Sequence, residues 1–183
     1  SEKGGVACLI RSVGTQERRF AHTGMMARGA AVGDGPAAAL SPPDSEQLTR
    51  LLAIGPVTVK LDIQVETRPE AESGNVIAEV VGRERPEEVV LLGCHLDSWD
   101  LGTGAVDDGA GCGIVVGAAH LILSLDEAPR RSIRVVLYGA EEVGLLGGIA
   151  YAERHVDEMD QHILAAESDF GADKIWRFET RFG

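Results

Sequence analysis

Four short polar clusters in the second half of the chain carry side chains that are suited to bind a metal ion. They are His95-Leu-Asp97, Asp107-Asp108, Glu141-Glu142 and Asp169 within the sequence ESD. Imidazole nitrogen and carboxylate oxygen together are typical zinc ligands, and a carboxylate that bridges two ions is typical of two-metal hydrolases. Without a cation, crowded carboxylates would repel one another. The residue types therefore predict a metal-dependent hydrolytic site.

Neighbouring positions within these clusters can have different roles. Asp97, two residues after His95, is placed to hydrogen-bond the second imidazole nitrogen and to fix the tautomer of the ring. The adjacent acids Glu141 and Glu142 can point in different directions, so that one binds the metal and the other accepts a proton from bound water. The glycines around Asp107 allow the backbone to turn this carboxylate inward.

Each cluster taken alone has an ordinary structural explanation. A single histidine such as His95 is most often a hydrogen-bonded residue of the core or rim. Asp107-Asp108 could cap the N-terminus of a helix, and Glu141-Glu142 could be acidic residues in a first helical turn. We favour the metal site because four separate segments deliver suitable ligand types to one predicted sheet edge.

Alternating strands and helices predict how the clusters come together. Apolar runs of strand length at 88–94, 133–138 and 162–166 alternate with helical segments at 107–125 and 145–159. This order predicts an α/β fold with a doubly wound, mostly parallel sheet. Ligands of such sheets bind beyond the carboxyl ends of the strands, where these polar clusters fall.

The first 81 residues predict a smaller α/β unit followed by two strands. A short strand at 6–10 precedes a helix at 45–53, which Gly55-Pro56 ends. Strict alternation of apolar and polar residues over 57–65 predicts a half-exposed strand at a sheet edge. A hairpin loop would join it to a further strand at 75–81.

Composition and charge narrow the classes of function. The 183 residues carry a net charge of -12, which would repel a nucleic-acid backbone or an anionic membrane. The longest apolar run, 113–125, contains His120 and is shorter than the ~20 residues of a membrane span. We therefore expect no nucleic acid and no membrane as partners. The three cysteines, Cys8, Cys94 and Cys112, show no C-x-x-C spacing, and they cannot all pair within one chain.

Three strings in the chain carry a specific resemblance. VVLLGCHLDSWDLGTGAVDDGAG, RVVLYGAEEVGLLG and HILAAESDFGAD resemble, in the right order, the co-catalytic di-zinc exopeptidases of the aminopeptidase and glutamate carboxypeptidase group. FAHTG and PAAALSPPDSEQLTRLL resemble the latter part of a protease-associated domain. The resemblance implies a partial protease-associated domain at 1–55 and the N-terminal part of a zinc exopeptidase catalytic domain at 56–183, without its C-terminal part.

The same resemblance implies which residues bind zinc. His95 and Asp169 would bind one ion, Asp107 would bridge two ions, and Glu142 would bind the other. The family's second site also needs a histidine on a later strand, and all five histidines here precede Asp169. The chain is then a fragment of a longer enzyme, or its second zinc site is incomplete. The resemblance further implies a cis peptide bond between Asp107 and Asp108.

The function implied by the resemblance is zinc-dependent hydrolysis of short peptides or dipeptides from one end. In this function Glu141 would be the general base and Asp97 the partner of His95. A peptide substrate, a secreted or periplasmic location and a homodimer as the candidate assembly complete the expectation.

Two alternatives from other classes stay open. The acidic rim could be vestigial in a non-catalytic binding or structural domain, an alternative supported by the missing histidine. A nucleotide-binding α/β domain is suggested by Gly109, Gly111 and Gly113, but the G-x-G-x-x-G spacing is absent. Asp107 and Asp108 would also repel a phosphate at that position.

Overall fold

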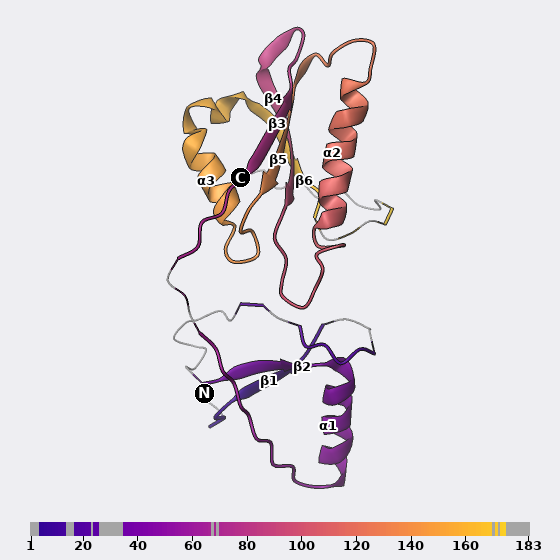
Figure 1. The fold of residues 1–183 in the computed structure, drawn as a ribbon, viewed down its shortest axis with the longest axis vertical. Coiled ribbons are helices and arrows are strands. Elements are labelled where there is room, and N and C mark those ends of the chain that lie inside the picture. Colours follow the sequence, from indigo (N-terminus) through magenta and orange to yellow (C-terminus); the bar gives the residue numbers. More distant parts are fainter. Residues whose placement is uncertain are drawn as a thin grey trace. The chain divides into compact units, whose positions relative to one another are not determined.

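Two units make up the chain in the computed structural model (Figure 1). The structure describes residues 4–13, 17–22, 24–25, 35–66, 68, 70–169, 171 and 173–174. The first unit comprises Ser1–Ala71 with Trp99–Leu101, and the second comprises Glu72–Ser98 with Gly102–Gly183. The domain boundary expected after residue 55 lies inside the first unit.

Among its described residues, the first unit contains two parallel strands and one helix. Strand β1 (Cys8–Arg11) pairs in parallel with β2 (Ala37–Leu40), and helix α1 (Pro42–Ile54) follows directly. The hydroxyl of Ser41 caps the helix by accepting from the backbone N–H of Asp44 at 3.3 Å. Proline at the first helical positions suits a helix start, because those N–H groups have no partner in the helix. The helix therefore begins three residues earlier than the sequence pattern predicted.

The strand predicted at 57–65 is wrong, and so is the hairpin that would follow it. Residues 56–66 form irregular backbone, and Val59, Ile63 and Val65 are exposed. Alternation of apolar and polar residues specifies a strand only where a neighbouring strand completes the hydrogen-bond ladder. Strand β3 (Val76–Val80) pairs instead with β5 (Arg131–Tyr138), which lies far away in the sequence.

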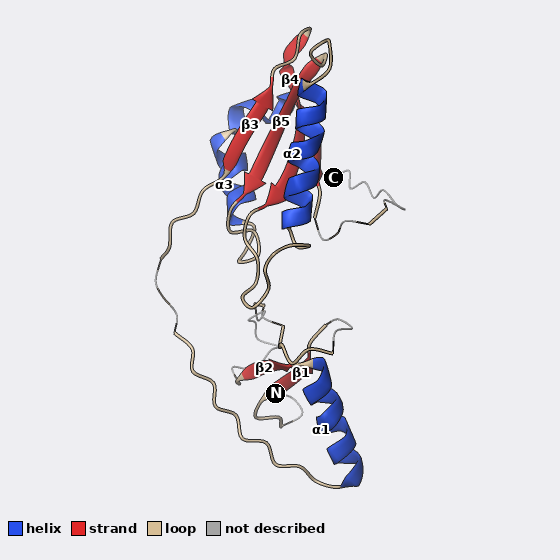
Figure 2. Ribbon diagram, turned by 45° about the vertical axis from the view of Figure 1, so that its right-hand side comes forward, coloured by secondary structure: helices blue, strands red, loops and turns tan. Residues whose placement is uncertain are grey.

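A four-stranded sheet forms the centre of the second unit, in the order β3-β5-β4-β6. Strand β4 (Arg85–His95) runs parallel to β5 and to β6 (His162–Glu167), whereas β3 is antiparallel to β5. Helix α2 (Gly109–Leu123) and helix α3 (Leu146–Arg154) lie on opposite faces of this sheet (Figures 1 and 2). The predicted α/β class is confirmed, with a mixed sheet that is mostly parallel.

The core of the second unit is divided between the two faces of the sheet. Val136 of β5 packs with Val89 and Tyr151 on the side of α3, while Val135 packs with Val115 on the side of α2. Successive residues of a strand point to opposite faces, so one apolar run can serve both layers. In the described part of the chain, no helix has both the length and the hydropathy to cross a lipid bilayer.

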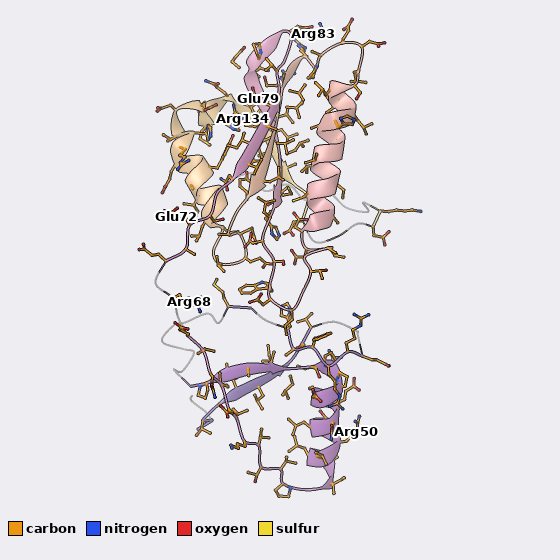
Figure 3. The ribbon with its side chains drawn as sticks, in the orientation of Figure 1. Arg50, Arg68, Glu72, Glu79, Arg83 and Arg134 are labelled. Atoms are coloured by element: carbon orange, nitrogen blue, oxygen red, sulfur yellow. The ribbon has the colours of Figure 1, made fainter. Side chains whose placement is uncertain are left out.

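Polar contacts of Tyr151 attach the α3 layer to the sheet. Its hydroxyl accepts a hydrogen bond from Arg134 at 2.9 Å and lies 2.8 Å from Nε2 of His162. Arg134 also pairs with Glu79 of β3 at 2.7 Å, and both residues are labelled in Figure 3. The helix predicted at 145–159 ends early at Arg154 and continues as a 3-10 helix over Val156–Gln161.

Candidate metal centre

The carboxyl ends of three parallel strands bring the predicted site residues to one edge of the sheet. His95 is the last residue of β4 and pairs with Tyr138, the last residue of β5. Gly93 pairs with Glu167, the last residue of β6. Asp169 follows β6 by two residues, and Glu141 follows β5 by three. The register of the sheet therefore aligns the segments that carry the polar clusters.

Three predicted ligands converge at this edge. Nε2 of His95 lies 3.0 Å from Oδ1 of Asp107 and 3.4 Å from Oδ1 of Asp169. These side chains form a group whose ligand atoms all lie within 4.8 Å of one another. The imidazole is buried, with 1% of its side chain exposed, whereas the carboxylates of Asp107 and Asp169 are 44% and 35% exposed. The centre is anchored at the buried ring and opens toward solvent through the carboxylates.

The tautomer of His95 follows from the second ring nitrogen. Nδ1 lies 3.0 Å from the backbone carbonyl oxygen of Asp97, which can only accept, so Nδ1 carries the proton and donates. In its neutral form the ring then presents a lone pair at Nε2 to two carboxylates. Positive charge at Nε2, from a proton or a metal ion, relieves the repulsion between these groups, and one imidazole with two carboxylates is a suitable donor set for zinc.

Asp108 has a structural role that differs from that of its neighbour Asp107. Its Oδ2 accepts from the backbone N–H of His95 at 3.0 Å, and its Oδ1 accepts from the N–H of Gly111 at 3.0 Å, which caps α2. The helix-cap explanation thus holds for Asp108, while Asp107 faces His95. The peptide bond between the two aspartates is cis, as the family resemblance implied.

The contact between Asp97 and the ring is made by the backbone and not by the carboxylate. The carboxylate oxygen Oδ1 lies 3.8 Å from Nδ1 of His95, beyond hydrogen-bond distance. Its two oxygens accept instead from the backbone N–H groups of Glu141 at 2.9 Å and Glu142 at 3.1 Å. Asp97 therefore contacts the ring through its backbone, and its carboxylate fixes the turn that carries both glutamates, which the sequence did not predict.

Glu141 and Glu142 are both half-buried at the start of this turn. Burial raises the pKa of Glu141; His95 lowers it, and the carboxylates of Asp169 and Asp97 raise it further. Glu141 is thus close enough to the centre to be affected by its charges. Glu142 is outside the group of three converging ligands and is joined to the site by its backbone bond to Asp97.

The charges around His95 also affect the ring in the absence of a metal. Burial lowers the pKa of His95, but the hydrogen bond to the Asp97 carbonyl and the surrounding carboxylates, Glu141 first among them, raise it overall. The ring is therefore in an environment that attracts positive charge, whether a proton or a metal ion.

Asn75 is a supporting residue that the sequence pattern does not reveal. Its side chain donates to the carbonyl of Gly147 at 2.8 Å and accepts from the N–H of Gly139 at 3.0 Å. It thereby ties together both ends of the turn that carries the glutamates. A Cβ added at Gly147 would come within 2.5 Å of Oδ1 of Asn75, so the junction is closely packed. An asparagine before a strand is common, and only the long-range contacts indicate its role.

Comparisons with known proteins identify the family of the chain. The profile of peptidase family M28 matches residues 75–173, which include every site residue described above. Carboxypeptidase Q from Mus musculus is 38% identical over 169 residues, and that from Xenopus laevis is 40% identical over the same length. Leucine aminopeptidase 2 from Trichophyton equinum is 38% identical over 131 residues, which cover 70% of this chain and 24% of that protein.

A solved structure is similar over nearly the whole chain. The structure of a peptidase M28 precursor from Shewanella amazonensis SB2B matches with a TM-score of 0.80 and 50% identity, covering 93% of this chain and 39% of that one. The alignments to carboxypeptidase Q cover 92% of this chain and 36% of those proteins. The chain thus spans little more than a third of the length of these relatives.

Proposed function

The chain belongs to peptidase family M28, and we propose on that basis that it carries part of the active centre of a zinc-dependent exopeptidase acting on short peptides. The observation that supports this function most directly is the convergence of Nε2 of His95 with the carboxylates of Asp107 and Asp169. We propose exopeptidase action because the relatives carboxypeptidase Q and leucine aminopeptidase 2 are both named for removal of terminal residues. A secreted or periplasmic location belongs to the same proposal and rests on the family resemblance.

We assign the ligand side chains of the centre to two proposed zinc ions. His95, Asp107 and Asp169 would hold one zinc ion, and Asp107 would be shared with a second ion that also takes Glu142. Bound zinc would supply a Lewis acid for the scissile carbonyl and would make a bound water more acidic. The buried, oriented imidazole of His95 suits this role, because its Nδ1–H is held by the Asp97 carbonyl.

Glu141 is the proposed proton acceptor and donor. Its carboxylate would take the proton of the attacking water and pass it to the amine that leaves when the peptide bond breaks. A carboxyl group whose pKa is raised, as burial raises that of Glu141, both accepts and returns a proton more readily near neutral pH. The bond from the Glu141 N–H to Asp97 fixes the backbone from which this side chain extends.

Replacement of Glu141 by glutamine in the full-length protein tests this function. The amide cannot accept the proton, so we expect hydrolysis of dipeptides to fall by about 10²–10⁴-fold while the zinc content is unchanged. Glu142→Gln is the matched variant: it should lower the zinc content, because it removes a proposed ligand. Unchanged hydrolysis in Glu141→Gln would contradict the base assignment. A zinc-loaded wild-type protein with no peptidase activity would favour the non-catalytic alternative.

A further inference from the structure

A second group of metal-ligating side chains lies against the backbone of His95. Sγ of Cys94, Sγ of Cys112 and a carboxylate oxygen of Asp108 all lie within 4.8 Å of one another. Cys94 is on β4 and is fully buried, Asp108 caps α2 with 1% of its surface exposed, and Cys112 lies in the first turn of α2. No side chain of this group has a role in the proposed reaction.

The donor atoms of this group keep the capacity to bind an ion. Each carboxylate oxygen of Asp108 accepts one backbone N–H and therefore has a further lone pair. The thiol of Cys112 donates to the carbonyl oxygen of His95 at 3.1 Å, so a fourth, oxygen donor lies beside the sulfur of Cys112. Two sulfur and two oxygen donors give the number of ligands that a tetrahedral ion requires.

We propose that Cys94, Cys112 and Asp108 form a buried binding site for one thiophilic divalent cation, such as zinc or cadmium. On binding, the ion forms a bond to each sulfur while both thiol protons leave to solvent. Two backbone N–H groups donate to the Asp108 carboxylate, and with this carboxylate in its ionised form the cluster has a charge of about -1 before and after the exchange. Because the exchange adds no net buried charge, it avoids the main cost of placing an ion in a protein interior.

The donor types determine which ions the site takes. Thiolates favour zinc and other soft ions, whereas Mg²⁺ and Ca²⁺ prefer sites made of oxygen alone. This distinguishes the cluster from the His95 centre, whose donors are one nitrogen and two oxygens. The inference does not depend on the proposed peptidase function, because it rests on a separate set of side chains.

Packing offers the competing explanation, in which both cysteines serve only as small core residues. Cys94 does contact Val115 and Val135 in the apolar layer beneath α2, with Cys112 at its border. Core packing accounts for the burial of Cys94 but does not require a second sulfur and a buried carboxylate within the same 4.8 Å. The two explanations differ in whether cadmium binds to sulfur.

Cadmium titration of the metal-stripped intact protein distinguishes them. A bond between thiolate and cadmium gives an ultraviolet charge-transfer band, and the His95 centre, which has no sulfur, gives none. We expect a band that saturates at about one cadmium per chain, disappears in Cys112→Ala and persists in Cys8→Ser, whose thiol is exposed. The cadmium NMR shift of the wild-type protein should report two sulfur ligands.

Three results would overturn the proposal. They are a wild-type protein without the band, a band of full strength in Cys112→Ala, and a band that disappears in Cys8→Ser. Far-UV circular dichroism checks the fold of each variant. If Cys112→Ala does not fold, Cys112→Ser keeps the size of the side chain and should lose most of the band for the same reason.

Discussion

The backbone carbonyl of Asp97 lies 3.0 Å from Nδ1 of His95 and fixes which ring nitrogen faces the metal centre. Because the backbone makes this contact, the carboxylate of Asp97 is available to hold the N–H groups of Glu141 and Glu142. One residue thus positions a proposed zinc ligand and the proposed general base together. The orientation of the His95 ring and the position of the Glu141 backbone therefore both depend on the turn after β4.

Asp97→Asn should separate these two functions. The variant keeps the backbone carbonyl that orients His95, but its amide offers one acceptor oxygen where the carboxylate offers two. We expect kcat of the intact protein to fall by about 10–100-fold, with a smaller change in zinc affinity. Kinetics and zinc content measured together test this, with the exposed residue Asp126 changed to asparagine as the control. A loss of zinc with unchanged kcat per zinc-loaded molecule would contradict it.

Asn75→Ala should loosen the turn that carries the glutamates. The variant leaves the N–H of Gly139 and the carbonyl of Gly147 without their side-chain partner, which costs about 1–3 kcal/mol of unfolding free energy. Urea denaturation measures this change, and Gln64→Ala, at an exposed amide, is the control. Equal losses in both variants would show that the Asn75 bonds add no stability.

Gly147→Ala and Gly148→Ala should have opposite effects. A Cβ at Gly147 would meet Oδ1 of Asn75 and the carbonyl oxygen of Gly139, each at 2.5 Å, whereas a Cβ at Gly148 meets nothing within 4 Å. We expect Gly147→Ala to destabilise the protein by about 1–3 kcal/mol. Gly148→Ala should stabilise it by about 0.5–1 kcal/mol, because alanine favours the helix. Thermal unfolding decides between this pattern and a similar response of both variants.

The sequence was most informative where local patterns suffice. The apolar runs that became β4 and β5 predicted both the strands and the polar clusters at their carboxyl ends, because a strand covered on both faces is apolar along its length. The run that became β6 also predicted its strand, although this edge strand is mostly exposed. The alternation over 57–65 failed, since a strand also needs a partner that local pattern does not supply. Strand β3 found its partner in β5, more than fifty residues away.

The supporting contacts could not be predicted, because they depend on register and on long-range packing. Asp97 was predicted as the partner of His95 because it follows two residues later in the sequence. The role of its carboxylate depends on the position of the turn after β5. Asn75 and the pair Cys94 and Cys112 acquire their contacts only when distant elements meet. The sequence therefore predicted which residue types could bind a metal, but not the contacts that hold these residues in place.

Acid should weaken the contacts that Glu158 makes with Arg134 and His155. Glu158 lies in the 3-10 helix that follows α3. The hydrogen bond from His155, and after it the bond from Arg134, hold the pKa of Glu158 below its ordinary value of 4.5. A carboxyl whose pKa is lower in the folded state stabilises the fold above pH 4.5, and this stabilisation is lost as the pH falls through the lower folded value.

Glu158→Gln should therefore reduce the unfolding free energy at neutral pH but not in strong acid. Denaturation of the variant and the wild type across the acid range measures the difference, with Glu153→Gln, at an exposed position of α3, as the control. A difference that stays constant down to strong acid would mean that the charge of Glu158 does not contribute.

Zinc titration of the metal-free intact protein tests the metal centre most directly, with Asp169→Asn as the decisive variant. Asp169 is partly exposed, and asparagine keeps its shape, so the change removes a proposed ligand with little effect on packing. We predict that zinc affinity at this centre falls by more than the ~10–100-fold that loss of a supporting residue causes. Asp173→Asn, an exposed acid four residues later, should leave the affinity unchanged. Equal zinc binding by wild type and Asp169→Asn would contradict the assignment of the centre.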